Sequence, residues 1–408
     1  MPLSNSEKTY GSVTKTFHWL TALLILSAIP LGIIASDLAH DLQDTTTAPD
    51  EATLALTATL FSLHKTIGVS VFFVALARIV WAVSQPKPGL LNGDNPPEAW
   101  LAETVHWLLY GSLVAVPLTG WAHHAATTGY APIWWPFGQA LPFVPRDPAV
   151  AEFAATLHYI LQWVLVGAVG LHIVGAFKHH VIDGDATLRR MLPGRSAAEP
   201  TAQQPGHALP LVTALAIWAT ALGGATALGW FSRVHENPAT AEALAQVESD
   251  WQVQDGTLSV TVRQLGSDVT GQFADWTAKI SYDETPDDSG KHGQVEVTIA
   301  TPSLNLGSVS AQAKGTGYLD TTAHPTATFA ADLLAREGGN VAVGSLTIRE
   351  QSVPVEMPFE LSIEGDTATA AGSVDIDRRD FGIGADVNNE GSLGFTVGIS
   401  FELTAVRQ

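Results

Sequence analysis

Two histidines, His158 and His172, are the residues whose type and spacing most clearly suggest chemistry. They are fourteen residues apart within one hydrophobic segment. Fourteen residues correspond to about 21 Å along an α-helix and to nearly a whole number of turns. Both rings therefore project from nearly the same face of the helix, at two different depths. A bilayer core is about 30 Å thick, which places one ring near each side. An ionisable ring inside a membrane span is costly and therefore indicates a functional site.

Two further histidines, His18 and His64, lie near the ends of two other hydrophobic segments. Four rings at two depths predict two metal centres, each held by two imidazoles, and we expect the metal group to be haem. The chain has no cysteine, which excludes disulfides, cysteine-ligated iron–sulfur clusters and thioether-linked haem. An iron with both axial positions filled changes oxidation state instead of binding oxygen. We therefore expect electron transfer, with no catalytic side chain.

Five stretches are long and apolar enough to be membrane helices. They are Phe17–Ser36, Leu60–Val83, Thr104–Ala122, Ala155–Phe177 and Pro210–Phe231. The first could be mistaken for a signal peptide, but its apolar run is too long and no small-x-small cleavage site precedes Asp37. We interpret it as a retained span.

The charges of the loops predict the orientation of these spans. The N-terminal tail and the second and fourth loops are basic, with Lys8, Lys15, Lys87, Lys178, Arg189, Arg190 and Arg195. The first and third loops are acidic, and Arg146 is their one basic residue. The positive-inside rule then puts the N-terminus in the cytoplasm and everything after Phe231 on the outer face.

This orientation sorts the four rings into two levels. His18 and His172 lie near the cytoplasm, and His64 and His158 lie near the outer face. A single membrane histidine is as often an interhelical hydrogen-bonding group as a ligand, so the matched levels are what favours metal centres. We interpret four other histidines as interfacial: His123, His124, His179 and His180. His106 stays open, as a residue that lines a haem edge or a quinone site.

Two basic residues within the spans also need partners. Arg78 is fourteen residues after His64, on much the same face but at the cytoplasmic level. A buried guanidinium there would pair with the propionates of the inner haem. Lys65 could do the same at the outer face or extend its ammonium to the water, and the sequence leaves both roles open.

Several segments of the first half resemble the bacterial cytochrome b561 family. They are Thr16-Phe17-His18-Trp19-Leu20, His64-Lys65-Thr66-Ile67-Gly68, Leu157–His180 and the tail Asp185–Pro193, within about Tyr10–Arg195. The resemblance implies a four-helix bundle in the bacterial inner membrane with two b-type haems. It implies that the iron ligands are His18, His64, His158 and His172 and that the third span supplies none. The arginine that the family carries in its second span corresponds to Arg78.

The same resemblance implies the function of an oxidoreductase-type cytochrome that moves electrons across the membrane. Quinones are the implied partners, and for some members superoxide is the donor at the outer face. This would make the protein a superoxide:quinone oxidoreductase.

The second half of the chain has a different composition. Met1–Ser232 holds 14 acidic and 10 basic residues, whereas Arg233–Gln408 holds 26 acidic and 10 basic residues. The acidic half argues against a nucleic-acid partner. After a linker at Ser232–Ser249, period-two alternation predicts about eight antiparallel strands in a barrel or sandwich. Thr257–Val262, Gln294–Ile299 and Val353–Ile363 are examples.

This half resembles the YceI family of lipocalin-like barrels over about Trp251–Val406. The matching pieces are Gly271-Gln272-Phe273, His324–Phe329, Gly344–Arg349, Val353-Pro354-Val355 and Asp380–Ile383. The resemblance implies a periplasmic barrel that holds an isoprenoid chain such as a quinone tail. Leu304–Tyr318 departs from the family by lacking a charged, histidine-containing segment. A barrel filled with side chains and one with a lipid cavity therefore both stay open.

The sequence thus predicts an all-α membrane haem bundle with a fifth transmembrane helix, followed by an all-β antiparallel barrel. The expected domains are the cytochrome at 1–200, the fifth helix and linker at 201–249, and the periplasmic barrel at 250–408. Electron transfer between a quinone and an outer-face donor is the leading hypothesis. In the alternatives, the cytochrome serves a separate periplasmic oxidoreductase with the barrel as docking module, or the barrel carries isoprenoid and the haems act as a redox sensor.

Overall fold

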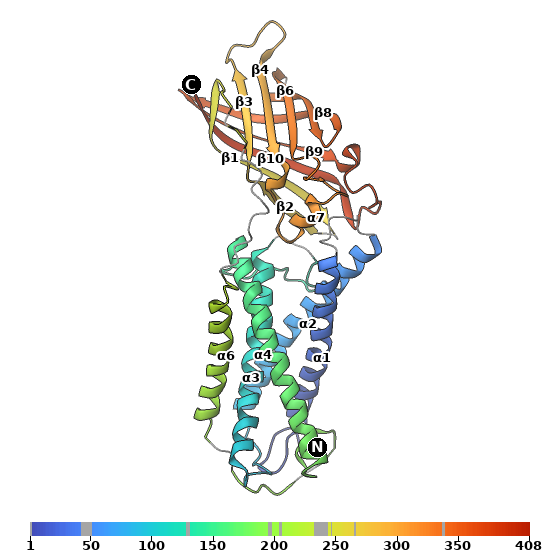
Figure 1. Cartoon of the computed structure of the whole chain (residues 1–408), viewed down its shortest axis with the longest axis vertical. Helices are drawn as coiled ribbons and strands as arrows, with labels where there is room; N and C mark the ends of the chain where they lie inside the picture. The colour runs from blue at the N-terminus through green and yellow to red at the C-terminus, as the bar shows by residue number, and fades with distance from the viewer. Residues whose placement is uncertain are drawn as a thin grey trace. The chain divides into compact units, whose positions relative to one another are not determined.

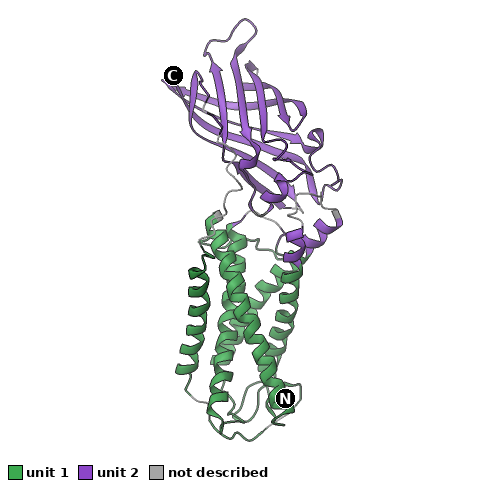
Figure 2. Cartoon of the chain, in the orientation of Figure 1, with its two compact units in different colours: residues 1–34, 60–126, 133–234 green, residues 35–59, 127–132, 235–408 purple. Residues whose placement is uncertain are grey.

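The structure is a computed structural model of the chain. It describes residues 2–41, 51–127, 131–194, 198–203, 206–231, 244–245, 247–264, 267–336 and 339–408. These residues form two compact units, one helical and one dominated by a β-sheet (Figures 1 and 2). The first unit comprises 1–34, 60–126 and 133–234, and the second comprises 35–59, 127–132 and 235–408.

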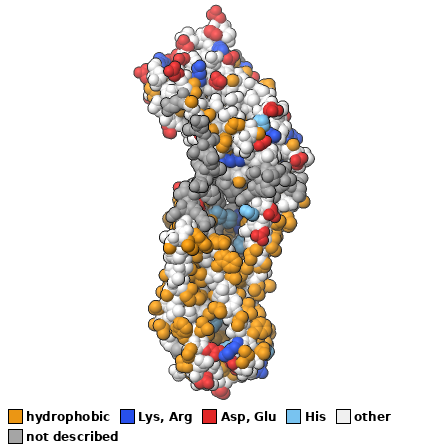
Figure 3. All heavy atoms as spheres, in the orientation of Figure 1, with side chains coloured by type: hydrophobic (Ala, Val, Ile, Leu, Met, Phe, Trp, Pro, Cys, Tyr) orange, Lys and Arg blue, Asp and Glu red, His pale blue; other side chains and the backbone are white. Residues whose placement is uncertain are grey.

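Five helices among the described residues are long and apolar enough to cross a membrane. They are α1 (Ser12–Asp41), α2 (Glu51–Val83), α3 (Pro96–Ala126), α4 (Pro148–Val181) and α6 (Ala208–Ala227), with a short α5 (Thr187–Met191) before the last. Hydrophobic side chains cover the visible face of the helical unit along its length, and charged ones gather at its lower end (Figure 3). This pattern suits a bundle whose sides face lipid. The expected multi-pass membrane region is confirmed.

The first four helices are longer than the apolar runs that predict them, because a helix continues past the hydrocarbon core into polar surroundings. At the start of α4, Asp147 accepts hydrogen bonds from the backbone of Ala149 and Val150, and Pro148 needs no such partner. The fifth span is shorter than predicted and ends at Ala227, just before Gly229 with its φ of 74°.

The fifth helix, α6, packs against α3 and α4. The approach is close at Gly111, where an added Cβ would lie 2.1 Å from the ring of Trp218. Figure 1 shows α6 on the outside of the bundle, beside α3. The four predicted ligands lie on α1, α2 and α4, and none of them lies on α6.

The second unit is built on one antiparallel sheet of ten strands, which confirms the all-β fold but exceeds the eight strands expected. The strands are β1 (Trp251–Gln264), β2 (Ser267–Phe273), β3 (Trp276–Tyr282), β4 (Lys291–Ala300), β5 (Leu304–Asn305), β6 (Thr326–Arg336), β7 (Gly339–Ile348), β8 (Gln351–Glu364), β9 (Thr367–Asp377) and β10 (Leu393–Arg407). Their order in the sheet is β3-β4-β6-β7-β8-β9-β10-β1-β2-β5.

Four short helical turns in the described part of the chain lie between some of these strands. They are η1 (Thr301–Ser303), η2 (Gly307–Val309), α7 (Ser310–Lys314) and η3 (Arg378–Phe381). The stretch that departs from the family pattern, Leu304–Tyr318, thus folds as β5, η2 and α7. Its residues Leu304, Leu306 and Val309 are buried in a small core with Val269.

The curled sheet has a seam between β1 and β3 that is held by side chains. Across this seam the hydroxyl of Ser249 accepts a hydrogen bond from the backbone N–H of Ile280 at 2.7 Å. Its one hydrogen is shared between the carbonyl of Trp251 at 2.8 Å and that of Ile280 at 3.0 Å. The Trp251 indole donates to the carbonyl of Tyr282 at 3.3 Å. Among the described strands, no backbone ladder pairs β3 with β1, so these side chains close the barrel wall.

Some sequence predictions fall on residues that the structure does not describe. Most of the predicted linker, Ser232–Ser249, lies outside the described residues, and so do parts of the charged loops at 42–50 and 195–197.

Two candidate bis-histidine centres

The four predicted ligands meet in two pairs inside the helical unit. The rings of His18 on α1 and His172 on α4 have centroids 5.9 Å apart, and we call them the first pair. The rings of His64 on α2 and His158 on α4 have centroids 6.3 Å apart, and we call them the second pair. The two α4 rings belong to different pairs, as the fourteen-residue spacing predicts.

Both separations suit a metal ion between the rings. Two imidazole nitrogens bound to one metal at about 2 Å each, with the half-width of each ring added, separate the centroids by about 6 Å. Two neutral imidazoles in axial positions are a common donor set for the iron of a b-type haem. The residues present therefore fit the group that the sequence implies.

In the second pair, one nitrogen of each ring is held by a backbone carbonyl. The Nδ1 atom of His64 lies 2.9 Å from the carbonyl oxygen of Ala28, and that of His158 lies 2.9 Å from the carbonyl oxygen of Val116. A carbonyl only accepts, so each Nδ1 carries the proton and donates it. Each Nε2 then keeps its lone pair for a metal.

Two glycines that the sequence reasoning missed make room for these rings. An added Cβ would lie 2.7 Å from the His64 ring at Gly32, and 2.9 Å from the His158 ring at Gly120. Each glycine follows the accepting carbonyl by four residues, one helical turn along α1 or α3. A glycine inside a membrane helix is the sequence signal, but it does not reveal which ring packs on it.

The first pair has a third imidazole beside it. The ring of His106 on α3 has its centroid 5.4 Å from that of His172. Among the described residues, no hydrogen bond to the rings of His18, His106 or His172 is found. His172 therefore has two imidazole neighbours at similar distances, one on α1 and one on α3.

Arg78 lies at the level of the first pair, close enough to act electrostatically on both His18 and His172. Its guanidinium carbon lies 5.1 Å from the centre of the Tyr110 ring. Within the part of the chain that the structure describes, no carboxylate pairs with this guanidinium. Such a half-buried cation suits an anionic group of a cofactor, as the sequence predicts.

Lys65 lies at the level of the second pair and is 6% exposed. Its charge acts on His64, and also on His123 and His124 near the end of α3. The His123 ring donates to the carbonyl of Ala151 at 2.8 Å. Each pair of ligands thus has one basic side chain close to it.

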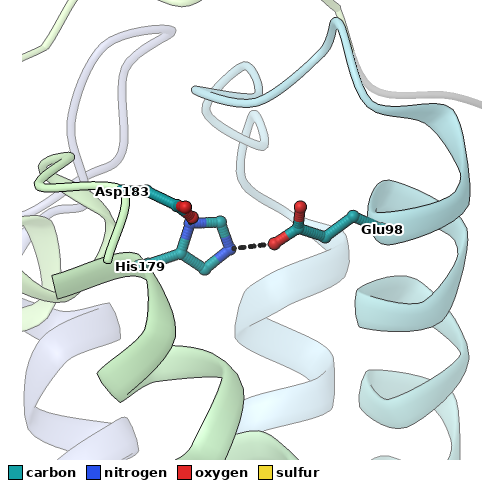
Figure 4. A group of neighbouring side chains, drawn as sticks. All are labelled: Glu98, His179 and Asp183. Atoms are coloured by element: carbon teal, nitrogen blue, oxygen red, sulfur yellow. Dashed lines mark ion pairs between the residues drawn. The ribbon is translucent and has the colours of Figure 1, made fainter. Parts of the chain in front are cut away.

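A second cluster joins the start of α3 to the end of α4. Glu98, His179 and Asp183 converge there, with ligand atoms within 4.8 Å of one another (Figure 4). Lys178 pairs with Glu98 and, at 2.8 Å, with Asp183. The lysine supplies the positive charge that these carboxylates require, so the cluster serves as an ionic link between the two helices.

A neighbouring carboxylate, Asp185, completes this link. Its oxygen lies 2.7 Å from Nδ1 of His179. Although burial raises the pKa of Asp185, hydrogen bonds from Thr187 and His179 lower it overall below its ordinary value. Asp185 is therefore anionic, and through His179 it links the loop after α4 to Glu98 at the start of α3.

The β unit encloses two adjoining cavities of about 150 Å³ and about 140 Å³. Both are bordered by Leu258, Ile299, Leu346 and Ile399. The first is lined by aliphatic and aromatic side chains such as Phe329 and Met357, and the second also by Gln312, Tyr318 and Arg378. Each cavity is about ten times as large as the space that one water molecule needs. Because the lining is apolar, it favours a hydrophobic occupant.

Arg378 closes one wall of the second cavity and is 2% exposed. Its guanidinium donates five hydrogen bonds to backbone carbonyls, those of Ile383, Gly384, Val387, Leu393 and Gly394. All five of its N–H groups are thereby used. Arg378 fixes the loop before β10 and has no donor left for a ligand.

Comparisons with known families match both units. Residues 9–194 match the model of prokaryotic cytochrome b561, and residues 251–405 match that of the YceI-like domain.

Curated relatives resemble the first part of the chain. Cytochrome b561 homolog 2 of Escherichia coli K12 is 31% identical over 200 residues, which are 49% of this chain and 98% of that protein. The probable superoxide oxidase CybB of Yersinia pestis is 25% identical over 190 residues, covering 46% of this chain and 97% of that protein.

Solved structures resemble the second part. BcnA of Burkholderia cenocepacia is 26% identical, with a TM-score of 0.34, and the match covers 37% of this chain and 96% of that one. The YceI protein of Campylobacter jejuni is 16% identical, with a TM-score of 0.32 over 42% of this chain and 96% of that one.

Proposed function

The chain belongs to the prokaryotic cytochrome b561 family and carries a YceI-like domain after it, and from this premise we propose that it transfers electrons across a membrane. The electrons would pass through two b-type haems, between a quinone and a donor on the outer face. The observation that carries the proposal is that four imidazoles of one helical bundle lie in two pairs, with ring centroids 5.9 Å and 6.3 Å apart. When bound, each haem supplies an iron that accepts and releases one electron.

The protein's own residues would bind and orient these groups. His18 and His172 would hold one iron, and His64 and His158 the other, and two imidazole ligands per iron favour electron transfer over oxygen binding. Arg78 would pair with a haem propionate near the first pair, and Lys65 would do so near the second. His106 would line the edge of the first centre, where a quinone could also approach.

Loop charge supports the direction in which the bundle is inserted. The positive-inside rule places the first pair at the cytoplasmic side and the second pair at the outer side of a bacterial inner membrane. The β unit would then be periplasmic. Superoxide is the outer donor we propose, because one relative is named a probable superoxide oxidase.

We also propose that the barrel holds an isoprenoid chain such as a quinone tail. The apolar lining of both cavities supports this. A long apolar chain would extend from the first cavity into the second, because four side chains border both.

A haem analysis of the purified full chain tests the electron-transfer proposal. A pyridine haemochrome spectrum should show haem b at two per chain, and superoxide or quinol should reduce it rapidly without a partner. Reduction that requires a co-purifying enzyme would assign the chain to electron transfer for that enzyme. A chain that binds no haem under any condition would overturn the proposal.

A further inference from the structure

The two pairs of histidines differ in the hydrogen bonds that their ring nitrogens make. Both rings of the second pair donate Nδ1–H to a backbone carbonyl at 2.9 Å. Among the described residues, neither ring of the first pair makes such a bond. The two candidate centres have the same ligand type, so this hydrogen bonding is the clearest difference between them.

The difference depends on Gly32 and Gly120. In an α-helix the side chain four residues after a carbonyl lies close over it, and here that residue has no side chain. An added Cβ at Gly32 would lie 2.9 Å from Nδ1 of His64, and one at Gly120 would lie 2.9 Å from Nδ1 of His158. Any larger residue would push the ring away from its acceptor.

A hydrogen bond from Nδ1–H to a carbonyl makes the imidazole a more basic ligand. A more basic axial ligand stabilises the oxidised iron and lowers its reduction potential. Nearby cations act in the opposite direction, but each level has one, Arg78 near the first pair and Lys65 near the second. Arg78 acts on both rings of the first pair, whereas Lys65 acts on one ring of the second, so the cations favour the same order as the two hydrogen bonds.

We propose that Gly32 and Gly120 are positioning residues that make the second pair the lower-potential centre. The inference rests on the proposed function and adds to it the order of the two reduction potentials and the residues that set this order. With haem bound at both pairs, transfer of one electron from the second centre to the first would be favourable. No bond is formed or broken and no proton moves in this step.

Single-centre variants of the full chain test the order of the potentials. His172→Ala should remove the first centre, and spectroelectrochemical titration should find the remaining haem at the lower of the two wild-type midpoints. His158→Ala should leave a haem at the higher midpoint. The opposite assignment would overturn the inference.

Glycine variants test the cause. Gly32→Ala and Gly120→Ala should raise the lower midpoint and leave the higher one unchanged. A tenfold change in the oxidised-to-reduced ratio corresponds to about 59 mV for one electron, and we expect a shift of that order. The electron paramagnetic resonance signal of the same low-spin centre should change with it, since the ring orientation changes.

Gly111→Ala is the matched control. It introduces a comparable clash on α3, at 2.1 Å from Trp218, away from all four ligands. It should lower stability without changing the separation of the midpoints. If the Gly32 and Gly120 variants bind two haems with unchanged midpoints, the inference fails while the proposed function stands. If the wild-type chain binds no haem, both fail.

Discussion

The ring of His106 lies closer to the ring of His172 than the ring of His18 does, with centroids at 5.4 Å and 5.9 Å. Distance alone therefore does not select the partner of His172. The sequence resemblance selects His18, and this choice makes a direct prediction.

Replacing His18 by alanine should reduce the haem content from two per chain to about one, because it removes one of the two imidazoles that we propose for the first centre. His106→Ala should keep both haems. The measurement is the haem-to-protein ratio of the purified variants. Retention of two haems in His18→Ala, with loss of one in His106→Ala, would show that α3 supplies the ligand instead.

Arg78→Gln should weaken binding of one haem, because it removes the cation that we place beside a propionate. Loss of a residue in the outer shell of a metal site commonly reduces affinity by about 10- to 100-fold. The rate of haem transfer to an excess of an apo-globin measures the effect. The transfer rate of Arg78→Lys should lie between those of the wild type and Arg78→Gln, since lysine keeps the charge but not the bidentate geometry.

A matched control for Arg78 is Arg189→Gln. Arg189 is exposed and donates to the carbonyls of Gly184 and Asp185 in the loop after α4. Haem transfer from this variant should equal that of the wild type. Equal transfer from both glutamine variants would contradict the assignment of Arg78 to a propionate.

Filling the first cavity should remove bound lipid from the barrel. Ala342 is buried and lines that cavity, so Ala342→Phe would occupy part of its volume at a cost of about 1–3 kcal/mol of stability. Mass spectrometry of an organic extract should find less isoprenoid per chain. Ala330→Phe, at an exposed position of β6, is the control and should retain the wild-type amount.

The stability of the β unit should depend on pH through Asp377. The hydrogen bond from Arg379, whose Nε lies 2.9 Å from the carboxylate, lowers the pKa of Asp377 from 3.8 to about 2. A lowered folded-state pKa means that the contribution is present above pH 3.8 and is lost as the pH falls towards 2.

The difference in unfolding temperature between the wild type and Asp377→Asn should therefore be constant above about pH 5 and shrink below pH 3.8. Thermal unfolding followed by tryptophan fluorescence at a series of pH values would measure it. In an Arg379→Ala background the difference should be much smaller at every pH. A difference that grows on acidification would contradict the assigned interaction.

Replacing Arg378 by alanine should destabilise the β unit by at least about 3 kcal/mol, because five carbonyls would lose their donor inside a buried site. Pulse proteolysis of the full chain in increasing denaturant gives the change. Arg336→Ala is the control, since Arg336 makes a surface ion pair with Glu356 that should contribute at most about 1 kcal/mol.

The sequence predicted those features that depend on local pattern. Apolar runs of about twenty residues located the membrane helices, and alternation at Thr257–Val262 and Gln294–Ile299 located β1 and β4. The fourteen-residue spacing of His158 and His172 placed their rings at two levels. Both family resemblances are confirmed by the matches at 9–194 and 251–405.

Features that depend on contacts between distant segments could not be predicted. The two-residue strand β5 has no pattern of its own and exists because it pairs with Gln272 and Phe273. The glycines at 32 and 120 could equally serve helix packing, and only the position of the facing rings gives them another role. The proximity of His106 to His172 depends on how α3 packs against α4.

The seam closed by Ser249 and Trp251 has a mechanical consequence. Because Ser249 precedes the first strand, the last residues of the connection into the barrel also form part of its wall. Displacing this connection would remove the two Ser249 hydrogen bonds that join it to β3. Tension on this connection would therefore act on the barrel wall through the Ser249 hydroxyl and the Trp251 indole, which lie two residues apart.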